Sequence, residues 1–94
     1  MRVIGLPVLE EFARRHADAK GRIQAWVAEV QAAQWASPND VKARYPHASF
    51  LKGNRVIFNI KGNNYRLCAV VGYQSQIVRV ELIGTHAEYD RWKL

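Results

Sequence analysis

The stretch RVIFNIKGNNYRLCAVVGY, residues 55–73, decides the fold of this chain. Apolar side chains alternate with other residues up to Ile60, and a second alternation begins at Tyr65. A period of two residues is typical of a β-strand with one buried face. Between the two runs stand Gly62, Asn63 and Asn64, and glycine and asparagine tolerate the positive φ angles of tight turns. The stretch therefore predicts an antiparallel β-hairpin.

The register of this hairpin depends on whether its loop has an even or an odd number of residues. A two-residue or a four-residue loop pairs Ile60 with Tyr65, Phe58 with Leu67, and Asn59 with Arg66. The apolar pairs then share one face, which needs a cover, and the polar pair lies on the other. We expect the second face to display Asn59, Lys61, Arg66 and Arg79.

The rest of the chain supplies that cover. Helical spacing of apolar residues predicts helices at about 7–17 and 23–33, and a Ser37 cap followed by Pro38 predicts a short helix ending by residue 45. Residues 1–5 are expected to form an edge strand or an arm. A third strand follows the hairpin, in which Val78, Val80 and Leu82 are expected to face the core. Residues 1–94 are thus expected to form one α+β domain, with N-terminal helices packed on one face of a small antiparallel sheet.

The segment GTHAEYD, residues 84–90, predicts a short C-terminal helix. Thr85 and Glu88 have the spacing of a capping box, in which each side chain pairs with a backbone N–H at the helix start. His86 would then be the first helical residue, and Tyr89 would share its face at i+3. The segment is either a well-capped helix only, or a helix start that carries a titratable group.

Composition restricts the partners and the compartment. The formal net charge is +6, which favours anionic partners such as nucleic acid. No apolar run is long enough to span a membrane, and no histidine or cysteine cluster has the spacing of a zinc site. The single cysteine, Cys68, is expected to be structural and permits no internal disulfide. We expect a cytoplasmic protein without a metal or other cofactor.

The order of these motifs resembles a known family. The stretch SPNDVKARYPHASFLKGNRVIFNIKGNNYRLCAVVGY (37–73), the later GTHAEYDR (84–91) and Trp35 together resemble the HigB-type toxins of type II toxin–antitoxin systems, which are relatives of RelE. The resemblance implies a RelE-like fold and ribosome-associated cleavage of mRNA that inhibits translation and growth, with no metal. It also implies a HigA-like antitoxin with a helix-turn-helix domain, whose complex with the toxin binds operator DNA.

RNA cleavage by attack of a 2′-hydroxyl on the adjacent phosphate needs proton transfer and positive charge. His86 is the candidate for proton transfer, because imidazole exchanges protons near neutral pH. Arg66 can bind two phosphate oxygens through its planar guanidinium, and Tyr89 can bind the phosphate or stack on a base. The candidate RNA-binding residues are Lys61, Asn63, Asn59, Arg79, Lys52 and Arg55. Each of these residues also has a simpler interpretation: a helix-cap histidine, a turn asparagine, a packing tyrosine or a solvated charge.

Two positions depart from the family pattern. Relatives often carry a basic residue where this chain has Val70 and Glu81. An acidic residue on the expected RNA-binding face weakens its attraction for phosphate. The alternative to a nuclease is therefore a non-catalytic RNA- or ribosome-binding module, or a protein-interaction module, on the same scaffold.

Overall fold

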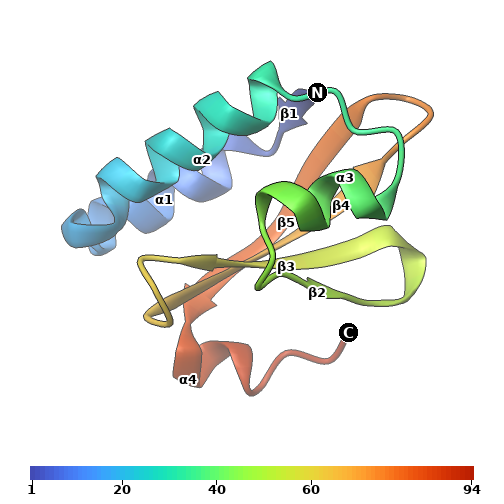
Figure 1. Ribbon diagram of the computed structural model, residues 1–94. Coiled ribbons are helices and arrows are strands. Elements are labelled where there is room, and N and C mark those ends of the chain that lie inside the picture. The colour runs from blue at the N-terminus through green and yellow to red at the C-terminus, as the bar shows by residue number, and fades with distance from the viewer.

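A five-stranded sheet with strand order β1-β5-β4-β3-β2 forms the centre of the structure (Figure 1). The computed structural model describes residues 1–94. The strands are β1 (Arg2–Ile4), β2 (Ser49–Phe50), β3 (Arg55–Ile60), β4 (Tyr65–Gly72) and β5 (Ile77–Thr85). β3, β4 and β5 form the expected antiparallel meander, while the N-terminal strand β1 pairs in parallel with β5. The α+β class is confirmed, and the sheet is mixed rather than purely antiparallel.

The N-terminal helices pack on one face of this sheet. They are α1 (Leu6–Arg15), η1 (Ala17–Ala19), α2 (Lys20–Ala32) and α3 (Pro38–Arg44). Two short helices follow later in the chain, η2 (Lys52–Asn54) and α4 (His86–Tyr89), and α4 does not belong to this layer. α1 and α2 lie side by side, and α3 crosses the sheet beside them (Figure 1). Phe12 of α1, Trp26 of α2 and Val41 of α3 are buried against Phe58 and Leu67 of the hairpin. The helices therefore cover the face that the apolar alternation predicts.

The hairpin has the predicted register. Ile60 pairs with Tyr65, Phe58 with Leu67, and Asn59 with Arg66. The loop is the four-residue alternative, residues 61–64, but its positive φ angles fall on Lys61 (52°) and Gly62 (62°), not on Asn63. The Asn64 N–H still donates to the Lys61 carbonyl at 3.2 Å, but Lys61 lies outside the strand, and its side chain leaves the face that strand alternation assigns to it.

The predicted face of Leu82 is wrong, because β5 carries a bulge. Cys68 pairs with Leu82, whereas the next residue, Ala69, pairs with Val80, so that Glu81 is the extra residue. A bulge reverses the alternation beyond it. Ile83 accordingly packs against the core, and Leu82 is 37% exposed.

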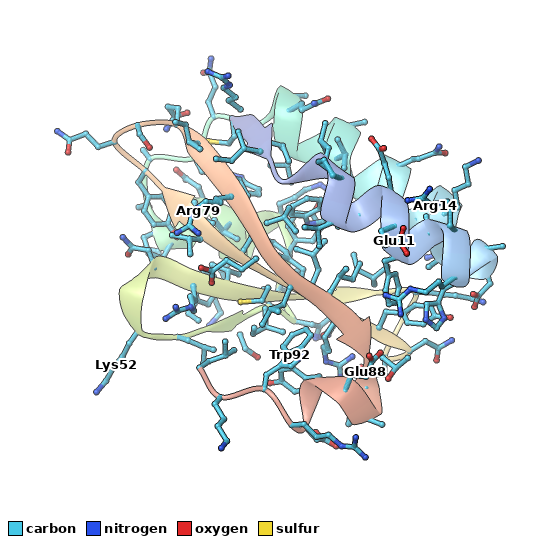
Figure 2. All side chains as sticks on the ribbon, turned by 180° about the vertical axis from the view of Figure 1, so that it is seen from behind. Glu11, Arg14, Lys52, Arg79, Glu88 and Trp92 are labelled. Carbon is cyan, nitrogen blue, oxygen red and sulfur yellow. The ribbon has the colours of Figure 1, made fainter.

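The second face of the sheet is less open than the sequence suggests. Ile57 and Cys68 lie on it, yet both are buried. The C-terminal segment provides part of the cover: a Cβ on Gly84 would lie 3.1 Å from the ring of Trp92. Figure 2 shows Trp92 between α4 and the sheet. Arg66 pairs with Gly84 and shares this face, so the C-terminal segment lies beside the candidate site.

The N-termini of the other helices differ in detail from expectation. Ser37 is the N-cap residue of α3, but its side chain makes no capping hydrogen bond. Asp40 supplies the local contact instead, because its carboxylate accepts a hydrogen bond from the Ala36 N–H at 2.8 Å. None of the helices combines the length and the apolar composition that a membrane span requires.

Candidate active site around Arg66, His86 and Tyr89

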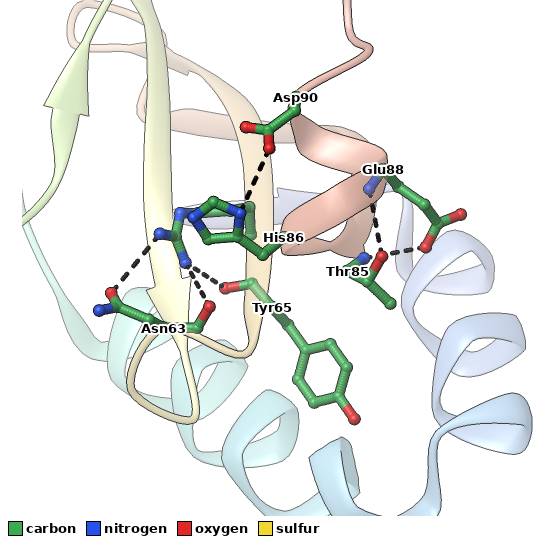
Figure 3. Close-up of polar contacts among 7 residues, drawn as sticks. Asn63, Tyr65, Thr85, His86, Glu88 and Asp90 are labelled. Atoms are coloured by element: carbon green, nitrogen blue, oxygen red, sulfur yellow. Dashed lines mark hydrogen bonds and ion pairs between the residues drawn. The ribbon is translucent and has the colours of Figure 1, made fainter.

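The capping box at the start of α4 forms as predicted. The Thr85 hydroxyl accepts a hydrogen bond from the Glu88 N–H at 3.2 Å, and the Glu88 carboxylate accepts one from the Thr85 N–H at 2.9 Å (Figure 3). The hydrogen bonds with Thr85 hold the pKa of the Glu88 carboxyl below its usual range. In addition, the His86 N–H donates to the carbonyl of Asn64 at 3.2 Å. This bond fixes the start of α4 to the hairpin loop.

Arg66 reaches from β4 toward this helix. Its guanidinium donates to the Asn63 carbonyl at 3.0 Å and to the Asn63 side-chain oxygen at 3.5 Å. Its Cζ lies 5.5 Å from the centroid of the Tyr89 ring, within the range of a cation–π contact. No carboxylate forms an ion pair with Arg66. Its positive charge is therefore held in place and left without a neutralising partner.

His86 contacts the same Tyr89 ring. The two ring centroids are 6.2 Å apart, in an edge-to-face arrangement. The Nδ1 atom of His86 lies 3.5 Å from a carboxylate oxygen of Asp90, one turn along the helix (Figure 3). The side chain of His86 is 53% exposed, so RNA can approach it. Asp90 was missed by the sequence analysis, although its i+4 spacing from His86 is a usable signal.

The arrangement brings together the groups that phosphodiester cleavage needs. Arg66 supplies fixed positive charge, His86 an exchangeable proton, and Tyr89 an aromatic surface in contact with both. Asp90 contacts Nδ1 and leaves Nε2 without a protein partner. A contact at one ring nitrogen of histidine favours proton exchange at the other. The structure thus places the three predicted catalytic residues in one cluster, and their catalytic roles stay predictions.

Lys61 does not join this cluster. Its ammonium forms an ion pair with Asp18 of η1 at 2.8 Å, on the side of the sheet that the helices cover. The Tyr65 hydroxyl donates to the same carboxylate, also at 2.8 Å. The hydrogen bonds from Lys61 and Tyr65 lower the pKa of Asp18. The expectation that Lys61 shares a face with Arg66 is wrong, because the left-handed backbone at Lys61 redirects the side chain.

Arg55 and Arg79 are both engaged by one acid. Glu81 lies 2.9 Å from Arg55 Nε and 3.1 Å from an Arg79 guanidinium nitrogen. The bulge at Glu81 places its carboxylate between the two cations. Two predicted RNA-binding charges are therefore partly neutralised, while Lys52 extends away from the molecule (Figure 2).

Asn59 and Asn63 line a cleft beside the Arg66 cluster. This cleft has a volume of about 590 Å³ and lies between the hairpin loop and the segment that joins α3 to β2. Its lining residues are Arg44, Tyr45, Pro46, His47, Ala48, Asn59, Gly62 and Asn63. Sequence patterns gave no indication that residues 45–48, which have no periodicity, line a cleft.

Cys68 is unsuited to nucleophilic chemistry. The residue is fully buried, and burial together with the nearby Glu81 charge raises the pKa of its thiol to about 11. A thiol that stays protonated is a weak nucleophile. No group of three or more His, Cys, Asp or Glu side chains gathers at a position that could hold a metal ion.

Comparison with known proteins gives one consistent result. Residues 19–92 match the family described as HigB_toxin, the RelE-like toxic component of a toxin–antitoxin system. The chain is 27% identical over 92 residues to the mRNA interferase toxin HigB of Escherichia coli K12. This match covers 96% of this chain and 88% of that protein. The mRNA interferase HigB of Shigella flexneri shows the same identity and coverage. A HigB protein from Escherichia coli O6:H1 is 23% identical over 93 residues, covering 97% of this chain and 90% of its own length.

Proposed function

This chain belongs to the HigB family of RelE-like toxins, the toxic components of toxin–antitoxin systems, and we propose that it is an mRNA endoribonuclease that inhibits translation and growth. The relatives that it matches over almost their whole length carry the name mRNA interferase. The observation that supports this activity in the chain itself is the cluster of Arg66, Tyr89 and His86, in which the arginine has no carboxylate partner.

The proposed reaction is intramolecular attack within the RNA. The 2′-oxygen forms a bond to the adjacent phosphorus, and its proton passes to the imidazole of His86. The bond from phosphorus to the 5′-oxygen breaks, and that oxygen takes a proton from solvent. The products are a 2′,3′-cyclic phosphate and a 5′-hydroxyl end. Arg66 stabilises the charge that builds on the phosphate oxygens, a contribution typically worth ~10²–10³ in rate.

Tyr89 and Asn63 would act as positioning residues in this site. Tyr89 contacts both Arg66 and His86 and can stack on a base or bind the phosphate. The carbonyl and side chain of Asn63 accept hydrogen bonds from Arg66 and set its orientation. No step in this scheme calls for a metal or another cofactor.

The proposed partners follow from family membership. A toxin–antitoxin system implies an antitoxin and an RNA substrate. We propose in addition that the antitoxin is a HigA-like protein with a helix-turn-helix domain and that cleavage occurs on the ribosome in the cytoplasm. Operator DNA would be bound only by the toxin–antitoxin complex. A neighbouring gene for a helix-turn-helix protein would support this arrangement.

The activity is tested by inducing the wild-type protein and the His86→Ala and Arg66→Ala variants, and by mapping the 5′ ends of transcripts. New 5′-hydroxyl ends with the wild type alone are the expected result. Equal numbers of new ends with all three proteins would remove His86 and Arg66 from the mechanism.

One observation favours a second candidate, a non-catalytic RNA- or ribosome-binding module. Glu81 partly neutralises Arg55 and Arg79 on the second face of the sheet, which weakens the attraction of this face for phosphate. Growth arrest without new 5′ ends would select this alternative over the nuclease.

A further inference from the structure

The hairpin loop, residues 61–64, contacts both candidate catalytic residues. The guanidinium of Arg66 donates to the carbonyl and to the side-chain oxygen of Asn63, at 3.0 and 3.5 Å. The His86 N–H donates to the carbonyl of Asn64 at 3.2 Å. The placement of the arginine relative to the histidine therefore depends on the position of this loop.

The backbone at the start of the loop is unusual. Lys61 and Gly62 both have left-handed backbone, with φ angles of 52° and 62°. Glycine adopts this conformation freely, whereas a lysine with a positive φ is uncommon and persists only where its surroundings hold it. A contact from outside the loop is therefore needed to hold Lys61 in this conformation.

Asp18 of η1 supplies such a contact. Its carboxylate accepts a hydrogen bond from the Lys61 ammonium at 2.8 Å and another from the Tyr65 hydroxyl at 2.8 Å. Lys61 is the first residue of the loop, and Tyr65 is the first residue after it. The hydrogen bond to Asp18 raises the pKa of Tyr65, so the hydroxyl remains a donor at neutral pH. One carboxylate thus holds both ends of the loop.

Tyr65 gives this contact a defined geometry. Lys61 and Asp18 are 38% and 47% exposed, and an exposed ion pair alone contributes little. Tyr65, in contrast, is buried, and its ring packs edge-to-face against Phe12 of α1 at a centroid distance of 5.3 Å. Its backbone pairs with Thr85, the N-cap residue of α4. The carboxylate is therefore fixed by a buried partner next to the candidate site.

We propose that Asp18, acting through Lys61 and Tyr65, is a positioning residue of the nuclease. We name this contact the loop clasp (Asp18, Lys61 and Tyr65). The inference rests on the proposed nuclease function and deepens it. The loop clasp holds the loop from the side that the helices cover, while Arg66 and His86 bind the two later residues of the same loop. Asp18 makes no contact with RNA, and its effect on cleavage passes through the loop.

The sign of the effect of Asp18→Asn separates positioning from simple electrostatics. The substitution removes a negative charge and frees the Lys61 ammonium, so charge alone predicts tighter RNA binding and faster cleavage. The loop clasp predicts the opposite, a kcat about tenfold lower without a rise in KM, because a small displacement of a catalytic group slows a reaction strongly.

The control for this substitution is Glu10→Gln, which removes the same charge at an exposed residue of α1 without an ion-pair partner. We expect its kcat to equal that of the wild type. A wild-type or higher kcat in Asp18→Asn, or an equal loss in Glu10→Gln, would overturn the proposal.

Two substitutions at Lys61 test the conformation of the loop. Lys61→Met breaks the loop clasp and keeps a residue that disfavours positive φ, whereas Lys61→Gly breaks it and adopts a φ of 52° freely. Both remove the same charge, so a direct contact of Lys61 with RNA would be lost equally in the two variants. We expect kcat to fall about tenfold in Lys61→Met and to be about threefold higher in Lys61→Gly than in Lys61→Met. Equal kcat values for the two variants would contradict the proposal.

Hydrogen exchange gives a measurement that needs no RNA. In ¹⁵N-labelled protein, the His86 N–H signal reports the bond to the Asn64 carbonyl. We expect it to exchange about tenfold faster in Asp18→Asn and in Tyr65→Phe than in the wild type, while the amides of α2 keep their rates. Tyr65→Phe keeps the buried ring and removes only the hydroxyl, so it tests the loop clasp with little change to the core. Unchanged His86 exchange in both variants, or equal acceleration in α2, would overturn the proposal.

The two proposals fail in different ways. Faster His86 exchange in these variants of a protein that cuts no RNA retains the loop clasp as the support of the loop and rejects the nuclease. Cleavage by Asp18→Asn at the wild-type rate retains the nuclease and rejects Asp18 as a positioning residue.

Discussion

The guanidinium of Arg66 lies over the ring of Tyr89, with Cζ 5.5 Å from the ring centroid. This contact joins the middle of the sheet to the last helix, because Arg66 belongs to β4 and Tyr89 ends α4. It leaves the charge of Arg66 available, since an aromatic ring attracts a cation without neutralising it. A phosphate can therefore bind Arg66 without displacing a competing acid.

Arg66→Ala should reduce the cleavage rate by ~10²–10³, the usual effect of removing a donor to developing negative charge. Arg79→Ala is the matched control, because Arg79 is exposed and already paired with Glu81. Single-turnover rates on one RNA, together with circular dichroism of each variant, measure the difference. Equal losses for the two variants would show that only overall charge matters.

Asp90 should position His86. Asp90→Asn removes the carboxylate that lies 3.5 Å from His86 Nδ1 and keeps the size of the side chain. We expect kcat to fall while KM stays unchanged, with a smaller loss than that of His86→Ala, for which ~10²–10⁴ is typical of a proton-transfer group. An Asp90→Asn variant with wild-type kcat would show that the contact has no role in proton transfer.

Gly84 allows α4 to lie close to the sheet. A Cβ at this position would lie 3.0 Å from Glu88 Cβ and 3.1 Å from the Trp92 ring, which is tighter than ordinary contact. Gly84→Ala should displace α4 and lower cleavage while the sheet stays folded. The Trp92 indole signal and the cleavage rate measure the two effects.

The control for this substitution is Gly21→Ala on α2, where an added Cβ meets nothing within 4 Å. Replacing a helical glycine with alanine typically stabilises the helix by about 0.5–1 kcal/mol. Gly21→Ala should therefore raise the urea midpoint and leave cleavage unchanged. If Gly84→Ala cleaves RNA as fast as Gly21→Ala, the close approach of α4 is unnecessary.

The hairpin register and the start of α4 were predictable from the sequence, because both depend on local chemistry. Parity of the loop determines the pairing of Asn59 with Arg66, and the Thr85–Glu88 spacing determines the capping box. The position of α4 next to the hairpin was partly predictable too, since β5 leads directly from the sheet into His86.

Features that depend on distant contacts were not predictable. The bulge at Glu81 reverses the orientation of Leu82, and nothing in the local alternation indicates an extra residue. The pairing of Lys61 with Asp18 joins residues that are 43 positions apart. The cleft between the hairpin loop and the α3–β2 segment depends on tertiary packing.

Cys68 should resist thiol reagents in the folded protein. Burial, followed by the nearby charge of Glu81, raises the pKa of its thiol to about 11, so the reactive thiolate is rare at pH 8. Modification by Ellman's reagent should follow the unfolding curve in urea. Reaction in native buffer as fast as in urea would contradict the burial of this thiol.

Asp18 should make stability depend on pH. Hydrogen bonds from Lys61 and Tyr65 lower the pKa of its carboxyl in the folded state, so folding gains stability above the unfolded value of about 3.9 and loses it as the pH falls through the lower folded value. Asp18→Asn should therefore lower the urea midpoint at pH 7, and the difference from wild type should shrink near pH 2. Glu10→Gln is the control, because Glu10 has no ion-pair or hydrogen-bond partner and should match the wild type at both pH values. A difference for Asp18→Asn that stays constant between pH 7 and pH 2 would show that the ionised carboxylate does not stabilise the fold.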